Sequence, residues 1–321
     1  MEDQEQIPHP HLRLGIIGAG SHSSNMIYPN LHALPAELVA VCDLDADRAS
    51  RNARRFGGQH FTDHTEMLDR AELDAVIVCV GPKEHARLSV EVMEAGLPVY
   101  TEKPPAASAA DARTVLEASR RTGQPCMTAF MKRFAPAYQK AHAAIVSPEF
   151  GAPSLLTIDS GLGLVHEDPS WLLFDFSIHV VDLARFLFGE VSEVYARTQQ
   201  QIAYATTLIF ANGAVGNVAV SAHRQGTITE EVEITGGFGD FITISDGSAM
   251  MRHHDNRVVD WHERPYAEIG YRLELAEFVS AIHEGREPES SIASSYQTMR
   301  LCEAIDLSAK ERRPVVLDEI H

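Results

Sequence analysis

A glycine-rich hexapeptide, Gly18-Ala19-Gly20-Ser21-His22-Ser23, directly follows an apolar run over Leu12–Ile17 and precedes a helical pattern. Its first glycine permits a tight turn after a strand, and its second lets the backbone approach a pyrophosphate. Ser23 stands where a third glycine is usual, and this small residue still allows a helix to pack closely on the strand. The order strand, turn, helix therefore predicts a dinucleotide site, with Ser21 and His22 beside the pyrophosphate.

An acidic residue ends the next apolar run. Asp43 follows a strand predicted over Glu37–Cys42, about twenty residues after Gly20. A carboxylate at this place can accept hydrogen bonds from the adenosine ribose and repels a 2′-phosphate, which favours NAD over NADP. The other interpretation makes Asp43 the cap of the following helix, but Asp45 is the better placed cap.

A carboxylate and an imidazole lie four residues apart on a helix predicted near Trp171–Phe188: Asp175 and His179 share one face. An imidazole, with an ordinary pKa near 6.5, suits a base that takes the hydroxyl proton of an alcohol while a nicotinamide takes the hydride. Asp175 would bind a neighbouring hydroxyl or tune the imidazole. The alternative is a surface pair of small value, or a network in which Asp182 holds His179.

These residues need elements that position them, and the first 128 residues alternate strands and helices. Near-continuous apolar strands separated by amphipathic helices predict a doubly wound parallel sheet covered on both faces. The predicted strands are Leu12–Ile17, Glu37–Cys42, Asp74–Val80, Leu97–Thr101 and Pro125–Thr128. The predicted helices between them are Asp45–Phe56, Glu84–Ala95 and Ala107–Arg121, and Gly96 and Gly123 follow two of these as left-handed caps.

After about residue 130, short alternating segments predict an α+β domain with a large, mostly antiparallel sheet. Asn212-Gly213 is a hairpin signal, and Gly236-Gly237 and Asp246-Gly247 mark further turns. The predicted strands are Gln201–Phe210, Ala214–His223 and Thr229–Thr235, and the predicted helices after Phe188 are Ile269–Glu284 and Ser294–Ser308. We expect a Rossmann domain over residues 1–130, a substrate-binding and oligomerisation domain over 131–321, and a hinge near Thr128–Pro136.

Composition excludes several classes of protein. The chain has 45 acidic and 27 basic residues and a net charge of −18, which disfavours nucleic acid and anionic membranes as partners. No apolar run approaches the roughly 20 residues that cross a bilayer. The first ten residues contain no apolar signal segment, so we expect a cytoplasmic protein.

The cysteines and histidines do not suggest a metal site. Cys42, Cys79, Cys126 and Cys302 form no closely spaced pair and are expected as inert core residues. The scattered histidines without a ligand pattern are His166, His223, His253 and His254. We therefore expect no metal.

Three more motifs follow in order: Glu102-Lys103-Pro104, the nonapeptide Phe130–Tyr138, and Asp175-x-x-x-His179-x-x-Asp182. Together with the glycine turn they resemble the Gfo/Idh/MocA oxidoreductase family over nearly the whole chain. The resemblance implies a Rossmann domain followed by an α/β domain with an open, largely antiparallel sheet. It also implies action on secondary alcohols of sugars and cyclitols, by a homodimer or homotetramer built through that sheet.

The resemblance assigns roles to single residues. Lys103 matches a lysine near the nicotinamide ribose and the reacting carbinol, where its charge would stabilise a developing alkoxide. Asp175 matches a substrate-binding aspartate, and His179 a catalytic histidine. The residues expected on the cofactor side are Pro82, His85, Glu102 and Lys103. Without the resemblance, Lys103 is also compatible with a solvated loop, and His85 with an ordinary early-helix position.

The segment before Asp175 departs from the family pattern. It is usually glycine-rich, but Asp168–Phe174 contains no glycine, and Ser177 stands where a glycine is common. Trp171, Phe174 and Phe176 are expected to line a smaller or more apolar pocket, with Trp171 in contact with the substrate.

Two adjacent cations open the second domain. Lys132 and Arg133 would bind an anionic group of the substrate, and we assign Arg133 to substrate contact on this basis. The alternative is that both cations pair with the plentiful acidic residues of the chain.

The sequence thus predicts an NAD-dependent dehydrogenase of a small sugar, polyol or cyclitol. Two alternatives stay open. One is a non-catalytic regulatory protein gated by a dinucleotide. The other is an enzyme that cleaves glycosides by transient oxidation with tightly held NAD.

Overall fold

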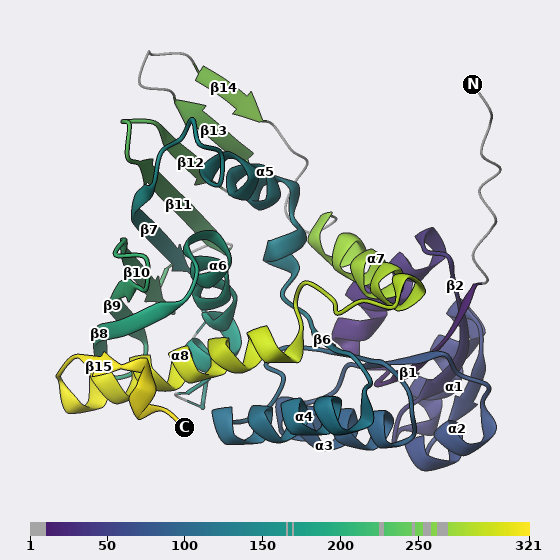
Figure 1. The fold of residues 1–321 in the computed structure, drawn as a ribbon. Coiled ribbons are helices and arrows are strands. Elements are labelled where there is room, and N and C mark those ends of the chain that lie inside the picture. The colour runs from purple at the N-terminus through teal and green to yellow at the C-terminus, as the bar shows by residue number, and fades with distance from the viewer. Residues whose placement is uncertain are drawn as a thin grey trace, which may run out of the picture. The chain divides into compact units, whose positions relative to one another are not determined.

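The computed structural model describes residues 11–164, 166–168, 170–224, 228–245, 248–252, 258–261 and 269–321. The chain forms two compact units (Figure 1). The first unit comprises Met1–Ala106, Thr114–Ala129 and Glu274–Ile292. The second comprises Ala107–Arg113, Phe130–Leu273 and Ala293–His321. A later segment of the chain, Glu274–Ile292, thus belongs to the first unit.

The first unit contains a six-stranded parallel sheet in the order β3-β2-β1-β4-β5-β6. Its strands are β1 (Leu12–Ile17), β2 (Ala36–Cys42), β3 (Gln59–Phe61), β4 (Ala75–Val78), β5 (Val99–Thr101) and β6 (Cys126–Thr128). This order is that of a doubly wound dinucleotide-binding fold, so the predicted class is confirmed. Successive residues such as Val76 and Ile77 point to opposite faces and are both fully buried, as in a sheet covered on both sides.

The helices of this unit are α1 (Ala46–Phe56), α2 (His64–Arg70), α3 (Pro82–Glu94) and most of α4 (Ala109–Thr122). Gly96 and Gly123 follow α3 and α4 with φ of 84° and 72°, the left-handed caps that the sequence predicts. The helix after the glycine turn is not a regular α-helix. It consists of a π turn, η1 (Ser23–Ile27), and a 3₁₀ helix, η2 (Tyr28–Ala33). Pro29 lacks the N–H that would continue an α-helical ladder here.

The second unit contains a sheet whose nine strands in the described residues have the order β14-β13-β12-β11-β7-β10-β9-β8-β15. They are β7 (Pro153–Gly161), β8 (Val191–Gln199), β9 (Ala203–Phe210), β10 (Val215–Ser221), β11 (Thr229–Gly236), β12 (Phe241–Ser245), β13 (Ser248–Arg252), β14 (Val258–Trp261) and β15 (Val315–Val316). Only β7 and β10 pair in parallel, so the mostly antiparallel sheet is confirmed. Asn212-Gly213 makes the predicted hairpin between β9 and β10, whereas Asp246-Gly247 lies outside the described residues.

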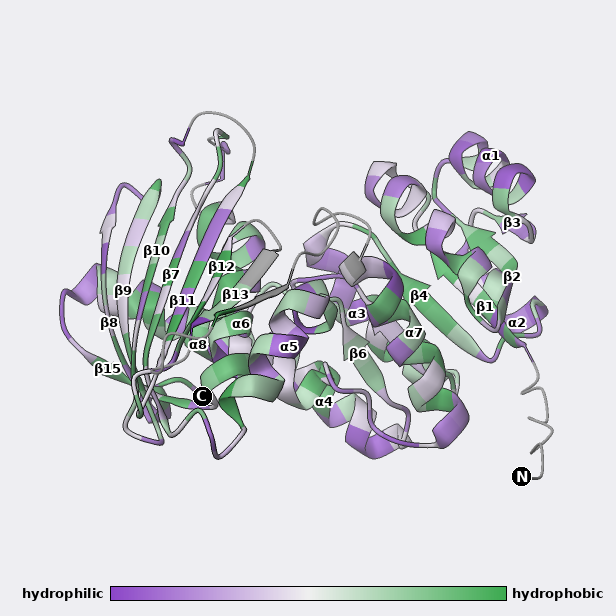
Figure 2. Ribbon diagram, turned by 90° about the horizontal axis from the view of Figure 1, so that it is seen from above, coloured by the Kyte–Doolittle hydropathy of each residue, from purple (hydrophilic) through white to green (hydrophobic). Residues whose placement is uncertain are grey.

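One face of this sheet carries the helices. They are α5 (Pro136–Ile145), α6 (Ile178–Phe188) and α8 (Ile292–Glu311), seen on the same side of the sheet in Figure 2. Along β10, Val218 and Val220 are buried while Asn217 and Ala219 are exposed. The sheet is therefore apolar toward its helices and open on the other face. The remaining helix, α7 (Ile269–Glu284), contributes to both units.

Two buried ion pairs fasten the short helix η3 (Met131–Phe134), which begins the second domain. Arg133 donates from Nε and Nη2 to the two oxygens of Asp182 on α6, at 2.7 and 2.6 Å. Lys132 Nζ donates to both oxygens of Glu230 on β11, at 2.6 and 2.7 Å. All four side chains are nearly inaccessible to water. The paired charges thus join η3 to the helix layer and to the sheet.

We predict that Asp182→Ala destabilises the protein by about 3–5 kcal/mol, because the variant leaves the Arg133 guanidinium buried without its counter-charge. Urea unfolding followed by circular dichroism measures the change. Removing an exposed partner, Glu94→Ala beside Arg121, should cost no more than about 0.5 kcal/mol. Equal effects of the two substitutions would contradict this role of the buried pair.

Candidate functional site

Four segments with predicted roles follow the carboxyl ends of adjacent parallel strands. The glycine turn follows β1, Asp43 follows β2, the Gly81-Pro82 turn comes shortly after β4, and Glu102-Lys103 follows β5. Parallel strands end at the same edge of a sheet, so the first unit gathers these segments there. The edge includes the point between β1 and β4 where the strand order reverses, which is where open α/β sheets bind ligands.

The two glycines of the turn have different constraints. Gly18 has a φ of 114°, and a Cβ there would stand 1.9 Å from the Cys79 carbonyl oxygen, so only glycine fits. A Cβ on Gly20 would meet no atom within 4 Å. Packing therefore does not require Gly20, and its missing side chain leaves open space over the backbone. Ser23 is fully buried and its hydroxyl donates to the Gly20 carbonyl, so this serine does pack against the turn.

Asp43 joins the glycine turn to the start of α1. Its Oδ2 accepts from the Ala19 N–H at 2.8 Å, and its Oδ1 accepts from the Asp45 N–H at 2.9 Å. Arg48 donates to the same Oδ1 from Nε and Nη2, at 3.2 and 2.9 Å. Burial raises the pKa of Asp43, but the Arg48 guanidinium and the two backbone N–H groups outweigh it, so the net shift is downward.

The predicted division of roles between the two aspartates is only partly right. Asp45 caps α1 by accepting from the Asp47 and Arg48 N–H groups, as expected. Asp43, however, already has partners in the structure, because its four hydrogen bonds fill the acceptor capacity of a carboxylate. Arg48 is the replaceable contact, since its side chain is 47% exposed. A ribose hydroxyl would reach Asp43 by taking the place of that guanidinium.

Glu102 links the glycine turn to the Glu102-Lys103-Pro104 motif. Its Oε1 lies 3.1 Å from His22 Nε2, and its Oε2 accepts from the Lys103 N–H at 3.1 Å. Burial raises the pKa of Glu102, but the hydrogen bond and charge of His22, followed by the charges of Lys103 and His85, bring it below its ordinary value. Residues eighty positions apart in the sequence, His22 and Glu102, therefore meet as an ion pair when His22 is protonated. Lys103 itself is half-exposed.

His85 is a buried connector between two loops. Its Nδ1 lies 2.7 Å from the Pro104 carbonyl oxygen and its Nε2 lies 3.0 Å from the Val80 carbonyl oxygen. Burial lowers the pKa of His85, which favours the neutral ring that donates only one of these bonds at a time. His85 is 1% exposed, so its role is structural: it connects two loops at the sheet edge where the segments predicted to bind the cofactor gather. Pro82, half-exposed at the start of α3, lies nearer the surface.

Asp175 and His179 lie in the second unit, on either side of a change in helix type. Asp175 belongs to a π turn, η4 (Leu172–Phe176), closed by the Ser177 N–H donating to the Leu172 carbonyl at 2.8 Å. His179 lies in the first turn of α6. Both side chains are half-exposed, and the Phe130 ring meets the His179 ring edge to face at 6.2 Å. The regular helix predicted through Asp175 is therefore interrupted, and π turns of this kind are frequent at functional sites.

The structure does not support the expected contact between Arg133 and the substrate. It is 5% exposed, and its charge is matched by Asp182 inside the second unit. Lys132 is equally buried against Glu230. The alternative interpretation, that these cations pair with acidic residues, is the one that the structure favours. The sequence around Lys132 and Arg133 does not indicate that their acidic partners lie on β11 and α6.

Glu274 is a residue that sequence reasoning missed. It lies on α7 within the first unit, is fully buried, and neither carboxyl oxygen has a hydrogen-bond partner among the described residues. Burial, and next the nearby negative charge of Glu102, raise the pKa of Glu274 well above its ordinary value. Burial and the charge of Glu274 likewise raise the pKa of the neighbouring Tyr100. These shifts favour the protonated, neutral form of both groups.

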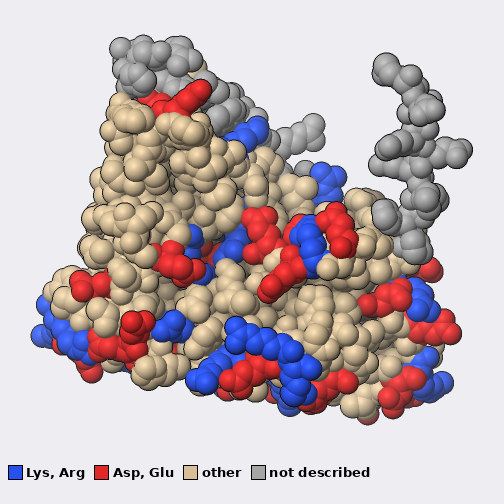
Figure 3. Space-filling model, in the orientation of Figure 1, with Lys and Arg blue, Asp and Glu red and all other residues tan. Residues whose placement is uncertain are grey.

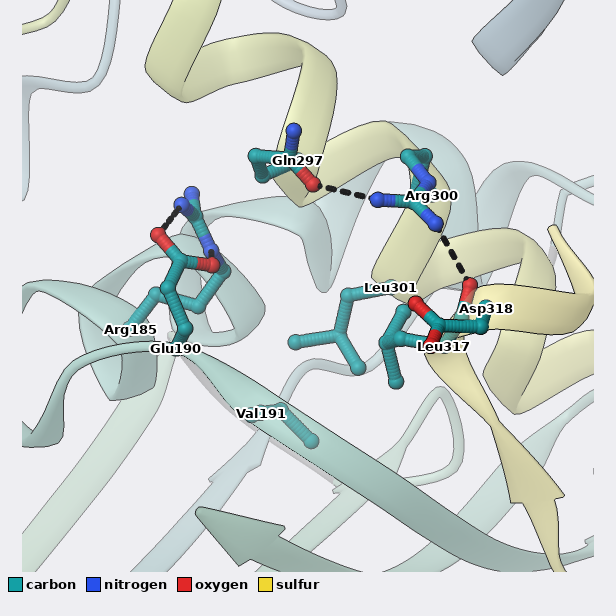
Figure 4. A pocket seen from close by; sticks show the side chains of 8 residues that line it. All are labelled: Arg185, Glu190, Val191, Gln297, Arg300, Leu301, Leu317 and Asp318. Atoms are coloured by element: carbon teal, nitrogen blue, oxygen red, sulfur yellow. Dashed lines mark hydrogen bonds and ion pairs between the residues drawn. The ribbon is translucent and has the colours of Figure 1, made fainter. Parts of the chain in front are cut away.

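A pocket of about 340 Å³ in the second unit contains none of the predicted site residues. It is lined by Arg185, Glu190, Val191, Gln297, Arg300, Leu301, Leu317 and Asp318 (Figure 4). Its two guanidinium groups are engaged: Arg185 binds Glu190, and Arg300 donates to Gln297 and to the Leu317 carbonyl (Figure 4). These contacts leave little cationic capacity for a ligand, so we assign no role to this pocket.

Among the described residues, no three histidine, cysteine or acidic side chains gather as a metal site. The four thiols are buried, as predicted, and burial followed by the Asp43 charge raises the pKa of Cys42 to about 12. No helix in the described part of the chain is long and apolar enough to span a membrane. On the face drawn in Figure 3, basic groups lie among acidic ones instead of forming a continuous basic patch.

Comparison with known proteins settles the family. Residues 12–130 match the Gfo/Idh/MocA model described as an oxidoreductase family with an NAD-binding Rossmann fold, and residues 166–317 match the model of its C-terminal alpha/beta domain. The chain belongs to the Gfo/Idh/MocA oxidoreductase family. Its Rossmann unit is accordingly an NAD-binding domain, and the open space over Gly20 and the ionised Asp43 fit that cofactor.

The similar proteins include several dehydrogenases. The chain is 30% identical to an inositol 2-dehydrogenase of Rubrobacter xylanophilus, covering 94% of this chain and 92% of that protein. It is 28% identical to a 4-carboxy-2-hydroxymuconate-6-semialdehyde dehydrogenase of Sphingobium sp., covering 94% and 100%. A crystal structure of an Agrobacterium radiobacter oxidoreductase with NAD⁺, L-tartaric acid and magnesium shares the fold, with a TM-score of 0.87, 22% identity and coverage of 97% and 100%.

The two glycines give a matched pair of variants. We predict that Gly20→Ala folds normally but weakens NAD binding at least about tenfold, because the methyl group occupies the open space over the backbone. Gly18→Ala should instead destabilise the protein by about 3 kcal/mol or more, since it combines a positive φ with a clash. Calorimetric titration with NAD and thermal unfolding separate the two effects. Unchanged NAD affinity in Gly20→Ala would contradict the placement of the pyrophosphate.

The buried carboxyl group of Glu274 predicts an unusual pH dependence of the protein's stability. Its folded pKa is raised, so above the unfolded pKa of about 4.3 the unfolded chain loses a proton that the native protein keeps. The contribution of Glu274 to stability is therefore complete below that pH and is lost as the pH rises toward the folded pKa. In urea unfolding from pH 4 to pH 8, Glu274→Gln should become steadily more stable relative to the unmodified protein. A constant difference across this range would show that Glu274 is ionised in the native state.

Proposed function

We propose that the protein is an NAD-dependent dehydrogenase that transfers a hydride between nicotinamide and a secondary alcohol of a sugar, polyol or cyclitol. The observation that carries this proposal is the gathering of the glycine turn, Asp43 and Glu102-Lys103 at one sheet edge of an NAD-binding domain. Inositol and other dehydrogenases among the relatives support the substrate class.

We assign the chemical steps to three side chains. NAD supplies the hydride acceptor. His179 takes the proton of the reacting hydroxyl. Its side chain is half-exposed but its Nδ1 is buried, so Nε2 is the nitrogen left for that transfer. The Lys103 ammonium stabilises the negative charge that develops on the alcohol oxygen. Asp175 accepts a hydrogen bond from a neighbouring hydroxyl and thereby orients the alcohol.

The charge of Asp43 favours NAD over NADP in this proposal. Its lowered pKa keeps the carboxylate ionised, and a carboxylate repels a ribose 2′-phosphate. A second acidic residue, the α1 cap Asp45, has its Oδ2 3.8 Å from Arg48 Nε and shares the positive charge of that guanidinium. Arg48 is thus outnumbered by two carboxylates, which leaves the local field unfavourable to an added phosphate.

We also propose that copies of the chain associate through the open face of the second unit's sheet. The strand register places Leu155, Val215 and Ile209 side by side on β7, β10 and β9. Leu155 and Val215 are 38% and 36% exposed, which is unusual for adjacent large apolar side chains. Light scattering after size-exclusion chromatography measures the number of copies. The cytoplasmic location stays a prediction.

A screen of sugars, inositols and polyols with NAD, followed by absorbance of the reduced cofactor, tests the activity. With the substrate so found, His179→Ala and Lys103→Met should each lower kcat by about 10²–10⁴-fold. NAD affinity should change less than about threefold in His179→Ala, since His179 has no assigned contact with the cofactor. Lys103 is expected beside the nicotinamide ribose, so Lys103→Met is compared by kcat at saturating NAD. His60→Ala, an exposed histidine on β3, is the control and should retain full activity. Full turnover in His179→Ala would refute the assignment of the base.

A further inference from the structure

Three aromatic rings of the second unit lie one against the next in the segment that carries Asp175. The rings of His166 and Trp171 are 5.3 Å apart and inclined by 18°, and those of Trp171 and Phe176 are 6.0 Å apart and inclined by 23°. We call these three residues the aromatic stack. Trp171 lies within the glycine-free stretch Asp168–Phe174, and His166 and Phe176 lie on either side of it.

The π turn creates the contact between Trp171 and Phe176. In an α-helix, residues five apart point roughly 140° away from each other. The i→i+5 hydrogen bond of a π turn adds about one residue per turn and brings such residues to the same side. The turn η4 makes this bond from Ser177 to Leu172, directly after Trp171. The π turn thus accounts for the stacking of the Trp171 and Phe176 rings.

Local hydrogen bonds hold the third ring in place. The Asp168 N–H donates to His166 Nδ1 at 3.0 Å, and Asp168 Oδ1 accepts from the N–H and the hydroxyl of Ser170, at 2.9 and 2.7 Å. The Trp171 N–H donates to the Asp168 carbonyl at 3.1 Å. The stack is therefore organised before any ligand arrives, which lowers the entropy cost of binding against it.

Burial separates the two kinds of apolar residue on this turn. Leu172 and Leu173 are 3% and 2% exposed and anchor the turn in the core. Trp171 and Phe176 are half-exposed, as are Asp175 and His179. Aromatic rings that served only the core would be covered like the leucines. These rings instead remain partly exposed, on the same turn as Asp175 and next to the helix that begins with Ile178 and His179.

The chemistry of the stack selects the shape of a ligand. Aromatic faces attract flat or C–H-covered surfaces and offer almost no hydrogen bonds to hydroxyl groups pressed against them. A closed sugar or cyclitol ring presents such a face, with its hydroxyls directed outward from the rim. An open-chain polyol has no rigid face and must lose rotational freedom to imitate one. The η3 cations Lys132 and Arg133 are already paired with Glu230 and Asp182, so they do not add a preference for an anionic group.

We infer that the aromatic stack is the substrate platform, and that the substrate is a closed ring with one face free of hydroxyl groups. This inference rests on the proposed function, because it places the reacting hydroxyl at the ring's edge, within reach of Asp175 and His179. Trp171 and Phe176 are then residues that determine specificity, and the chain discriminates against the open-chain form of the same carbon skeleton.

The chain has two tryptophans, so Trp261→Phe leaves Trp171 as the sole tryptophan reporter. The NAD-loaded single-tryptophan protein is titrated with D-glucose, D-xylose and myo-inositol, and with sorbitol and xylitol, the open-chain counterparts of the two sugars. Saturable change of Trp171 emission with at least one ring compound, and none with its counterpart at equal concentration, is expected. No response to any ring compound, or equal responses to ring and chain, overturns the inference.

Kinetic variants add a readout with a matched control. For the ring substrate identified by the screen, Trp171→Ala and the milder Phe176→Leu should raise KM at least about fivefold, with kcat changed less than about threefold. Phe186→Leu is the control, because Phe186 is a half-exposed ring on α6 that stacks on His142, at 4.5 Å, outside the aromatic stack. Equal KM values in all three variants overturn the inference. The Trp171 fluorescence titration decides the matter even if Trp171→Ala fails to fold.

The two proposals fail in distinguishable ways. Ring-dependent fluorescence without turnover of any compound would overturn the dehydrogenase function and leave the ring platform in place. Turnover with an open-chain polyol as the best substrate, and with no response from Trp171, would confirm the dehydrogenase and overturn the platform.

Discussion

Two buried carboxylates contact the glycine turn of the first unit, one from each side of β1 in the strand order. Asp43, at the end of β2, accepts from the Ala19 N–H, and Glu102, after β5, contacts His22. Nearby donors and positive charges keep the pKa of both carboxyls low in spite of burial, so both are ionised. These two contacts help to position the turn for a pyrophosphate, together with the Tyr28 hydroxyl and the Asn52 amide, which donate to the Gly18 and Ala19 carbonyl oxygens. The parallel strand order makes them possible by ending β1, β2 and β5 on one edge.

In the second unit, two buried ion pairs hold the start of the domain in place. Arg133 with Asp182 and Lys132 with Glu230 fix the entry to the domain against α6 and the sheet. Asp182 lies one turn beyond His179 on the same helix, so the anchored helix also sets the position of the imidazole. These cations are paired with acidic residues inside the protein, whereas Trp171 and Phe176 are half-exposed. In the proposal above, substrate recognition therefore falls to the aromatic residues and not to Lys132 and Arg133.

The sequence predicts those features that depend on local pattern. Apolar runs located β1 and β2, Asn212-Gly213 located a hairpin, and Asp45 was correctly expected as a helix cap. It does not predict features that depend on tertiary partners or on hydrogen-bond register. The strand β3 (Gln59–Phe61) has two exposed residues of three and no apolar run, and the π turn at η4 follows from an i→i+5 bond that leaves no periodic signature. Charged letters such as Arg133 and Glu274 suggest surface residues, yet folding buries both.

In the proposed function, Lys103 and His179 act on the same bound alcohol. Single-turnover rates of hydride transfer, measured for Lys103→Met, His179→Ala and the double variant, test it most directly. Groups that act together on one transition state are strongly non-additive. We predict that the double variant is about as slow as the slower single variant. A double variant whose loss equals the product of the two single losses would show that the two residues act independently, and would contradict the account.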